Sequence, residues 1–340
     1  MRIVVQGTNW IGDAVMSIPA LRFLREARPE AHITLFTRPW AEGVFGDCDF
    51  IDEILPSQSG TKTKDLATDA KTLRKGGFDA GLLLTNSFRT AFVLRLAGIR
   101  ERVGYANEGR SFLLTRSFEF PDWKNQRHES GFYLNLVESW TGKIAAETPS
   151  AVIDVSQARR DEARLLLSEI GAAQPIVALG VGSQNSRAKR WPTEHFAEVA
   201  KRMIEERGAS IVLLGSESEH EVAERVLEIC GGRAVNLCGK TTLSSAVGIL
   251  ATVDLFISND MGLAHIAAAT QTPSLTIFGP TNPLTTKPFG GEIIKEEGID
   301  CAPCMLRDCP IDHRCMTRIT ASEVFEKACG MLSERFLDGI

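Results

Sequence analysis

RIVVQGTNWIGDAVMSIPALRFLRE, residues 2–26, joins an apolar run to a glycine-containing loop and then to a segment with helical spacing. The apolar run at 2–6 has the length and composition of a strand buried on both faces, as in a parallel sheet. A strand, a short loop and a helix form the repeating unit of a doubly wound α/β domain. The stretch therefore predicts this fold, with the loop at the carboxyl edge of the sheet, where ligands bind.

The same alternation continues along the chain and starts a second time near residue 176. Because both series combine short apolar strands with amphipathic helices, we expect two Rossmann-like, doubly wound, parallel-sheet domains facing a cleft, the usual place for a ligand. The strands are expected at 2–6, 32–37, 51–55, 79–84, 176–179, 210–214, 255–258 and 274–278, and the main helices at 14–26, 64–75, 88–97, 131–140, 159–170, 193–206, 219–230, 263–269 and 321–336.

Residues 100–150 interrupt this alternation with many glycines and prolines around one helical stretch. We place the end of the first domain and a linker there. The predicted division is therefore 1–157 for the first domain, 158–320 for the second and 321–340 for a terminal helix, and a chain of 340 residues suits two domains.

The composition narrows the class of protein. Hydrophobic residues make up 44% and charged residues 24%, as in ordinary globular proteins. A net charge of −5 does not favour a nucleic-acid partner. No apolar run approaches the roughly 18 residues of a membrane span, and residues 1–7 are too short and polar for a signal peptide. We expect a cytoplasmic protein whose eight cysteines are mostly reduced, or metal-bound if suitably spaced.

The first glycine loop, at 7–14, carries one carboxylate, Asp13, near the start of a helix. The helix dipole and backbone donors keep such a carboxylate ionised, so Asp13 is a candidate base for an acceptor hydroxyl. Capping of the helix is the alternative, which spacing alone favours, and the two roles are compatible. The loop lacks the dinucleotide-binding spacing. Asn9 and Trp10 from this loop, with Arg89, are our candidate acceptor-binding residues.

The second loop, GVGSQNSRAKRWP at 180–192, follows the first strand of the second series. Backbone N–H groups and small hydroxyls of such a loop cradle a diphosphate, and Lys189 supplies a mobile positive charge. Ser183 and Gln184 are further candidates for donor binding. Three cations beside a Gly/Ser turn favour phosphate binding over a merely solvated basic loop, although the Walker A spacing is absent.

A third motif begins where the strand at 255–258 ends in Asn-Asp and a helix of small residues follows. The start of such a helix is open to an anion. Asp260 is a candidate for binding sugar hydroxyls, or for capping the helix. Met261 and Gly262 can offer backbone groups to a phosphate. His265 is included among the donor-binding candidates, although a lone helix histidine is more often structural.

Three glutamates, Glu217, Glu219 and Glu221, follow the strand at 210–214. A carboxylate at a strand end commonly binds a ribose diol. Any of the three could do so, and the preference of acids for helix starts explains them equally well.

Four cysteines and His313 fall within fifteen residues near the end of the second domain. The Cys-x-x-Cys half suits a tetrahedral metal, whereas the spacing of the second half is atypical. A structural zinc, a redox-labile disulfide and free thiols in a compact loop all remain open, with free thiols favoured; the cysteines are Cys301, Cys304, Cys309 and Cys315.

The order and spacing of these motifs resemble the heptosyltransferases that build the lipopolysaccharide inner core, over nearly the whole chain. The Lys-Arg-Trp-Pro form and the cysteine loop are more similar to the type II members than to type I. The residues that carry the resemblance are Gly12-Asp13, Ala188 to Pro192, Asn259 to Ala269, and the Pro303-Cys304, Cys309-Pro310 and Cys315-Met316 pairs.

The resemblance implies a GT-B fold and a metal-independent transfer of L-glycero-D-manno-heptose from ADP-heptose, with inversion at the anomeric carbon and no cofactor. The implied acceptor is the first heptose of a Kdo-lipid A core, which places the enzyme at the cytoplasmic face of the inner membrane as a peripheral protein. It implies that Asp13 is the base, that Lys189 neutralises the leaving diphosphate, that Asp260 lies near the donor heptose and that Glu221 binds ribose.

Two features depart from the family pattern, and both concern the donor. Met261 stands where the family usually has Ser or Thr, and the loop at 182–186 differs from the expected Gly-x-Glu-rich form. A GT-B transferase for another nucleotide sugar in cell-envelope assembly is therefore the first alternative, and a non-catalytic nucleotide-binding protein the second. Eight cations against four acids at 89–127 suggest a surface for the acidic core oligosaccharide, at even odds with a solvated surface.

Overall fold

The computed structural model describes residues 1–58, 62–231 and 234–337, and the chain divides into two compact units, Met1–Ala151 and Val152–Ile340. We describe each unit by itself. The domain boundaries that the sequence predicts at 157 and 320 stay predictions. Residues 59–61, 232–233 and 338–340 of the predicted domains lie outside the described residues. The long helix at the end of the second unit, α14 (Ala321–Leu337), packs on helix α8 (Thr193–Arg207) and strand β10 (Leu255–Asn259) of the same unit.

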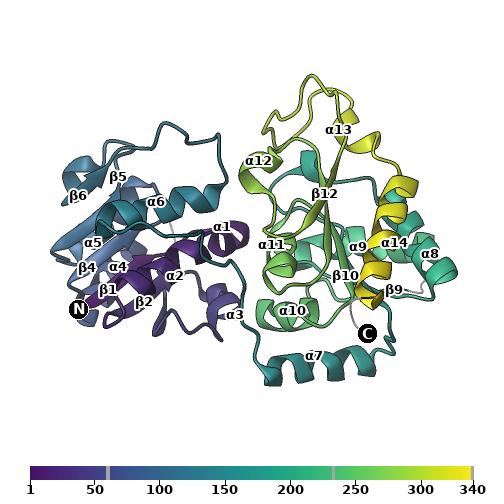
Figure 1. The fold of residues 1–340 in the computed structure, drawn as a ribbon, viewed down its shortest axis with the longest axis horizontal. Helices are drawn as coiled ribbons and strands as arrows, with labels where there is room; N and C mark the ends of the chain where they lie inside the picture. The colour runs from purple at the N-terminus through teal and green to yellow at the C-terminus, as the bar shows by residue number, and fades with distance from the viewer. Residues whose placement is uncertain (59–61, 232–233, 338–340) are drawn as a thin grey trace. The chain divides into compact units, whose positions relative to one another are not determined.

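Unit 1 contains a six-stranded parallel sheet in the order β3-β2-β1-β4-β5-β6 (Figure 1). The central strand β1 pairs with β2 on one side and with β4 on the other. The strands are β1 (Arg2–Gln6), β2 (His32–Thr37), β3 (Glu53–Pro56), β4 (Ala80–Leu83), β5 (Glu101–Tyr105) and β6 (Arg116–Phe118).

Helices cover both faces of this sheet, with α2 against α6 in one layer and α4 against α5 in the other. The helix expected at 14–26 is in fact two helices that meet at Ser17. Pro19, in the first turn of α2, explains the break, because a proline inside a continuous helix removes one hydrogen bond and its ring clashes with the preceding turn. The helical elements are α1 (Ile11–Met16), α2 (Ile18–Ala27), η1 (Pro39–Ala41), α3 (Glu42–Phe45), α4 (Thr63–Gly76), α5 (Phe88–Leu96), η2 (Ser111–Leu113) and α6 (Glu129–Thr141).

Strands β5 and β6 lie within 100–150, where the sequence analysis placed the end of the first domain and a linker but expected no strand. They are short and contain charged residues, so they lack the continuous apolar run of a central strand. Arg102 on β5 is buried because its guanidinium donates hydrogen bonds to the carbonyls of Leu113 (2.6 Å) and Ile99 (2.5 Å). Burial lowers the pKa of Arg102. The backbone carbonyls thus stabilise a buried arginine charge, whereas the sequence pattern predicts that a charged side chain is exposed.

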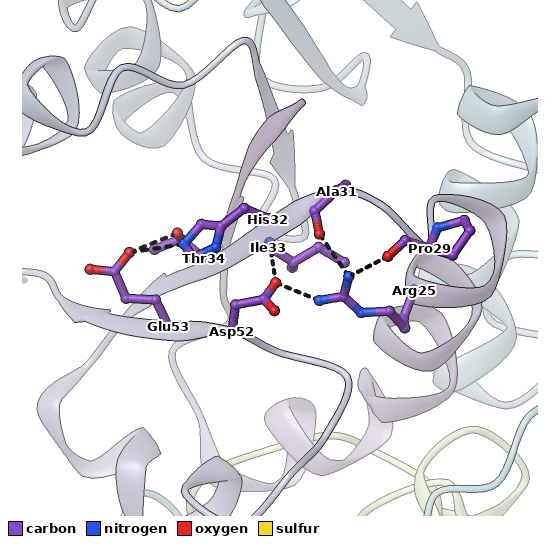
Figure 2. A network of polar contacts seen from close by, with 8 residues as sticks. All are labelled: Arg25, Pro29, Ala31, His32, Ile33, Thr34, Asp52 and Glu53. Carbon is purple, nitrogen blue, oxygen red and sulfur yellow. Dashed lines mark hydrogen bonds and ion pairs between the residues drawn. The ribbon is translucent and has the colours of Figure 1, made fainter.

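A polar network fastens the β2–β3 edge of unit 1 (Figure 2). Asp52, directly before β3, accepts hydrogen bonds from the backbone N–H of Ile33 (2.7 Å) and from the Arg25 guanidinium. Arg25 also donates to the carbonyl of Ala31 at 2.7 Å. Burial opposes ionisation of Asp52, but these bonds and the Arg25 charge prevail and lower its pKa below 3.8. The network joins the end of α2 to the sheet.

Unit 2 contains a second six-stranded parallel sheet, in the order β12-β11-β10-β7-β8-β9. Helices α8, α9 and α14 form one layer, and α7, α10 and α11 pack together in another. The strands are β7 (Ile176–Gly180), β8 (Ser210–Leu213), β9 (Ala234–Asn236), β10 (Leu255–Asn259), β11 (Ser274–Phe278) and β12 (Glu292–Lys295). The helical elements are α7 (Gln157–Glu169), η3 (Arg187–Lys189), α8 (Thr193–Arg207), η4 (Glu217–Glu219), α9 (His220–Cys230), α10 (Leu243–Leu250), α11 (Gly262–Ala269), α12 (Pro283–Thr286), α13 (Arg314–Thr317) and α14 (Ala321–Leu337).

The two sheets share one topology, because β7 and β10 occupy in unit 2 the places of β1 and β4 in unit 1. The order of the strands reverses between these two neighbours. In open α/β sheets, ligands bind beyond the carboxyl ends of the strands at this switch point. The fold thus brings the 7–14 and 84–89 loops together in unit 1, and the 180–192 and 259–262 loops together in unit 2. No helix among the described residues is long and apolar enough to cross a membrane.

Candidate active site

Asn259 connects the two loops at the switch point of unit 2. It ends β10 and is completely buried. Its amide nitrogen donates to the carbonyls of Val181 (2.9 Å) and Gly182 (3.1 Å), and its amide oxygen accepts from the backbone N–H of Trp191 at 2.9 Å. Since one carboxamide satisfies both ends of the 180–192 loop, it fixes the position of the residues between them.

The central polar group of this edge consists of Lys189, Asp260 and Thr281. The Lys189 ammonium lies 2.7 Å from Oδ2 of Asp260, and the Thr281 hydroxyl donates to the same oxygen at 2.7 Å. Asp260 is only 5% exposed, whereas the Lys189 side chain remains 27% exposed. A buried carboxylate therefore holds a cation at the rim, where the cation also meets solvent and can reach an anionic ligand.

A second segment, residues 300–315, braces the Lys189 loop. His313 Nε2 donates to the carbonyl of Ala188 at 2.5 Å, and the Ala188 N–H donates to the carbonyl of Arg307 at 2.9 Å. The backbone N–H of Met305 donates to the carbonyl of Pro280 at 2.8 Å, next to Thr281. This 300–315 segment is thus bonded beside both Lys189 and Thr281, the two donors to Asp260.

The four cysteines of the 300–315 segment are free thiols. Burial raises the pKa of Cys315 to about 11, and the three other cysteines of the segment contribute to that rise. No group of three or more His, Cys, Asp or Glu side chains in the described part of the chain is arranged to hold a metal ion. The zinc and disulfide alternatives for Cys301, Cys304, Cys309 and Cys315 therefore find no support in the placement of these side chains.

The remaining donor-binding candidates occupy the same edge in different ways. Ser183 is buried, and its carbonyl accepts hydrogen bonds from Arg190, whereas Gln184 is exposed. Met261 and Gly262 are half-buried at the start of α11. Met261 packs on Gly180 so closely that a Cβ on that glycine would lie 2.7 Å from its sulfur. The fifth candidate, His265, is buried within α11.

Glu219 is the buried member of the three glutamates, at 3% exposure, while Glu217 and Glu221 are exposed. Its Oε2 accepts from the N–H and the hydroxyl of Ser216, at 2.7 and 2.9 Å. Oε1 is buried with no hydrogen-bond partner among the residues that the structure describes. A Cβ on Gly182 would lie 2.1 Å from that atom, so the carboxylate fills the space beside the β7 loop.

In unit 1, Asp13 lies in the first turn of α1 and is half-buried. The hydroxyl of Tyr133 on α6 donates a hydrogen bond to the Asp13 carboxylate. Burial, then the charges of Asp13 and Glu129, then this bond raise the pKa of Tyr133, so the phenol stays protonated. Asn9 and Trp10 precede α1 and are exposed, Trp10 by 53%. Asp13 is therefore oriented by a neutral donor while its loop remains open to solvent.

Arg110 organises the β4–α5 loop, which leads into α5 and Arg89. It is completely buried and donates to the carbonyls of Thr85 (2.7 Å) and Tyr105 (2.9 Å). Burial lowers the pKa of Arg110 to about 10. Of the eight cations at 89–127, Arg102 and Arg110 thus serve the interior rather than a ligand, which corrects part of the expected basic surface. Arg89 is half-buried, and its Nη2 has no hydrogen-bond partner in the described part of the chain.

Comparison with known proteins agrees with this architecture. Residues 68–314 match the family model for glycosyltransferase family 9 (heptosyltransferase). The chain belongs to glycosyltransferase family 9. It is 30% identical to lipopolysaccharide heptosyltransferase 2 of Escherichia coli K12 over 85% of this chain and 86% of that protein. It is also 27% identical to lipooligosaccharide heptosyltransferase 2 of Haemophilus influenzae, over 87% and 91% of the two chains.

Solved structures of this family have the same fold. The structure of Escherichia coli ADP-heptose LPS heptosyltransferase II superposes with a TM-score of 0.84 at 26% identity, over 98% of this chain and 99% of that one. The family 9 glycosyltransferase of Veillonella parvula gives 0.85 at 22% identity over 98% and 97%, which shows the fold alone. The predicted GT-B fold is confirmed, and the protein is a glycosyltransferase of the heptosyltransferase family that serves lipopolysaccharide synthesis.

The sequence interpretation missed three side chains that organise the candidate site of this family 9 glycosyltransferase. Thr281 follows β11, and nothing in its sequence context indicated a bond to Asp260. Tyr133 is in a helix far along the chain from Asp13. His313 was noted only for its place among the cysteines, whereas its imidazole bonds the Lys189 loop. Only tertiary structure brings these partners together.

Proposed function

We propose that this enzyme transfers L-glycero-D-manno-heptose from ADP-heptose to the first heptose of a Kdo-lipid A core, with inversion and without a metal. The observation that carries the proposal is the Lys189–Asp260–Thr281 group at the switch point of unit 2. The names of the relatives in Escherichia coli and Haemophilus influenzae, both heptosyltransferase 2, support the choice of donor sugar and acceptor.

On the donor side, Lys189 neutralises the negative charge that develops on the leaving ADP. In a site without a metal, a positioned cation and helix N-termini supply this stabilisation. Asp260 holds Lys189 in place and contacts the hydroxyls of the donor heptose. Gly262 and neighbouring backbone groups at the start of α11 meet the phosphates, with Ser183, Gln184, Met261 and His265 around them.

On the acceptor side, Asp13 removes the proton from the attacking hydroxyl as the new glycosidic C–O bond forms and the bond to ADP breaks. Tyr133 acts as a positioning residue, because its donated hydrogen bond orients the carboxylate. Inversion requires the attacking oxygen and the leaving diphosphate to be on opposite sides of the anomeric carbon. Asn9 and Trp10, which are exposed, contact the acceptor together with Arg89.

The ribose contact has two candidates. Glu221 is the residue that the family resemblance favours, and it is exposed on α9. Glu219 is buried in η4, which follows β8, and its Oε1 is unpaired among the described residues, so a ribose hydroxyl that reached this buried atom would satisfy it. Binding of ADP to Glu219→Gln and Glu221→Gln separates them, since the variant that removes the ribose contact weakens ADP but not inorganic diphosphate.

The transfer itself is tested with labelled ADP-heptose and cores that carry no heptose or one heptose, in the presence of EDTA. The proposal expects product with the one-heptose core alone, undiminished by EDTA, and an inverted anomeric configuration by NMR. Product on bare Kdo-lipid A contradicts the proposed acceptor. Loss of transfer with EDTA contradicts metal independence, and a retained anomeric configuration contradicts inversion.

The Asp13 assignment needs its own variant. Asp13→Asn keeps the shape and the bond from Tyr133 but removes the base, so transfer should fall by about a thousandfold or more while ADP still binds. Undiminished turnover would remove Asp13 from the chemistry.

The second candidate function is transfer from another nucleotide sugar, which Met261 favours because it takes the place of a hydroxyl side chain. A panel of ADP-, GDP- and UDP-sugars with the wild-type enzyme decides between them. Faster transfer from a GDP- or UDP-sugar than from ADP-heptose would replace the proposed donor.

A further inference from the structure

The outer face of α5 in unit 1 presents an apolar patch, which we call the α5 patch and define as Phe88, Phe92, Leu96 and Phe112. Phe112, in η2, is 71% exposed, Phe88 40% and Leu96 37%. The Phe88 ring stacks on Phe92 with centroids 6.1 Å apart and meets Phe112 at 6.0 Å. Two exposed phenylalanines and a leucine grouped around the half-buried Phe92 mark an interaction surface more often than single exposed residues do.

The helical repeat explains why this patch is continuous. Residues 88, 92 and 96 are spaced four apart, so they follow one side of α5. The buried residues of the same helix, Ala91, Val93 and Leu94, belong to the core of the unit. Phe92 is half-buried and packs on the same core, whereas Phe88 and Leu96, one turn to either side of it, are exposed. Burial within unit 1 therefore explains Phe92 but not the exposed phenylalanines and leucine around it.

The rim of the α5 patch is mainly cationic. Arg95 is exposed on α5 itself, and Arg100 is exposed just beyond its end. Arg74, at the end of α4, is also exposed and donates to the Leu96 carbonyl at 2.5 Å. Helix α5 carries no acid, and the nearby acid Glu108 accepts from the Phe88 N–H at the opposite end of the patch. Aromatic rings with flanking arginines are complementary to an anionic lipid surface.

We propose that the α5 patch docks unit 1 on an anionic membrane, with the phenylalanine rings in the headgroup region and the arginines on lipid phosphates. The position of the α5 patch explains what such docking would do, and this part of the argument rests on the proposed function. Phe88 directly precedes Arg89, a candidate contact of the acceptor, and follows the β4–α5 loop at the carboxyl edge of the sheet. An acceptor held in the bilayer by its acyl chains would be met at the edge where Asp13 lies.

Co-sedimentation with vesicles tests the docking without any transfer step. The wild-type protein is mixed with vesicles of phosphatidylethanolamine alone or with added phosphatidylglycerol, in low and high salt. We expect binding to the anionic vesicles that weakens with salt, and a loss of roughly tenfold or more in the double variant Phe88→Ser/Phe112→Ser. Arg95→Gln should show a smaller loss. The matched control is Leu165→Ser, since Leu165 is 61% exposed on α7 of the other unit and should leave binding unchanged.

Two acceptors distinguish membrane docking from contact with the sugar. With a deacylated, water-soluble core, the double variant should keep the wild-type kcat and KM. With the acylated core in vesicles, its apparent KM should rise by about tenfold. An equal loss on both acceptors would place the phenylalanines in the acceptor site and overturn the proposal.

Failure of the wild-type protein to bind anionic vesicles would also overturn the proposal. So would a concentration-dependent dimer that the double variant abolishes, because the patch would then join two copies of the chain. Vesicle binding that persists when the enzyme proves to use another donor or acceptor would refute the proposed function while leaving the docking intact.

Discussion

Gly182→Ala is the substitution that most directly tests the packing of the β7 and β8 loops. The new Cβ would lie 2.1 Å from Oε1 of Glu219 and 2.4 Å from its Cγ, well inside any real contact distance. The variant folds only if Glu219 moves. Glu219 is 3% exposed, and its Oε2 is held by two hydrogen bonds from Ser216, so it cannot move without breaking them.

The magnitude follows from these contacts. Forcing one methyl group into a packed interior costs about 1–3 kcal/mol. Loss of hydrogen bonds to a buried carboxylate adds about 1–2 kcal/mol. We therefore expect the free energy of unfolding of unit 2 to fall by about 2–5 kcal/mol. ADP should also bind more weakly, because Asn259 bonds the Gly182 carbonyl and the backbone at this point cannot shift without moving the Lys189 loop.

Guanidinium denaturation of four proteins measures this: wild type, Gly182→Ala, Glu219→Ala and the double variant. In the double variant the methyl group occupies the space of the missing carboxylate. Its stability should lie within about 0.5 kcal/mol of Glu219→Ala, so the coupling energy should be about as large as the cost of Gly182→Ala itself, about 2–5 kcal/mol. Gly330→Ala is the matched control, because a Cβ at this exposed position in α14 meets nothing within 4 Å. It should stabilise by about 0.5–1 kcal/mol. A cost of Gly182→Ala that is small, or unchanged when Glu219 is absent, refutes the reasoning.

Three further outcomes follow from single contacts. Tyr133→Phe removes the hydrogen bond to Asp13 and should lower kcat about tenfold at unchanged KM for the donor; steady-state kinetics in which only KM rises would contradict the positioning role. His313→Ala should weaken ADP binding about fivefold by calorimetry, because the Lys189 loop loses its brace, and His313→Gln, which keeps an N–H donor, should restore most of it; equal losses in both variants would argue against the bond. The pKa of Asp52 is lowered in the folded state, so its contribution is present above the unfolded pKa near 3.8 and is lost as pH falls through the folded value. Asp52→Asn should therefore cost about 0.5 kcal/mol at neutral pH, a small amount because the pair is partly exposed, and nothing at the lowest pH in denaturation series; a constant difference at every pH would count against this linkage.

The sequence predicted the architecture well because central strands carry a strong signal. Strands β1, β4, β7 and β10 are buried on both faces, so each is a short apolar run followed by a glycine or polar loop. The same runs define the switch points, which is why Lys189 and Asp260 were expected on one edge and lie 2.7 Å apart.

The edges of the sheets could not be predicted in the same way. Strands β5, β6, β9 and β12 are short or contain charged residues, and their pairing depends on neighbours that periodicity does not reveal. The buried arginines show the same limit. Arg110 reads as part of a basic surface, yet its guanidinium is bonded to carbonyl groups at the end of β5 and in the β4–α5 loop. Among the glutamates, local composition is equal, and only packing against Gly182 distinguishes Glu219.

The bracing of Ala188 by Arg307 and His313 has a consequence for engineering donor preference. More than a hundred residues of chain separate the 180–192 loop from the 300–315 segment, but their hydrogen bonds make them one structural unit. A chimera that exchanges only the 180–192 loop with that of a relative would place the relative's lysine next to a 300–315 segment that does not match it. Transplanting both segments as a pair, with Pro280 and Thr281, is the smallest exchange that carries the geometry of the lysine with it.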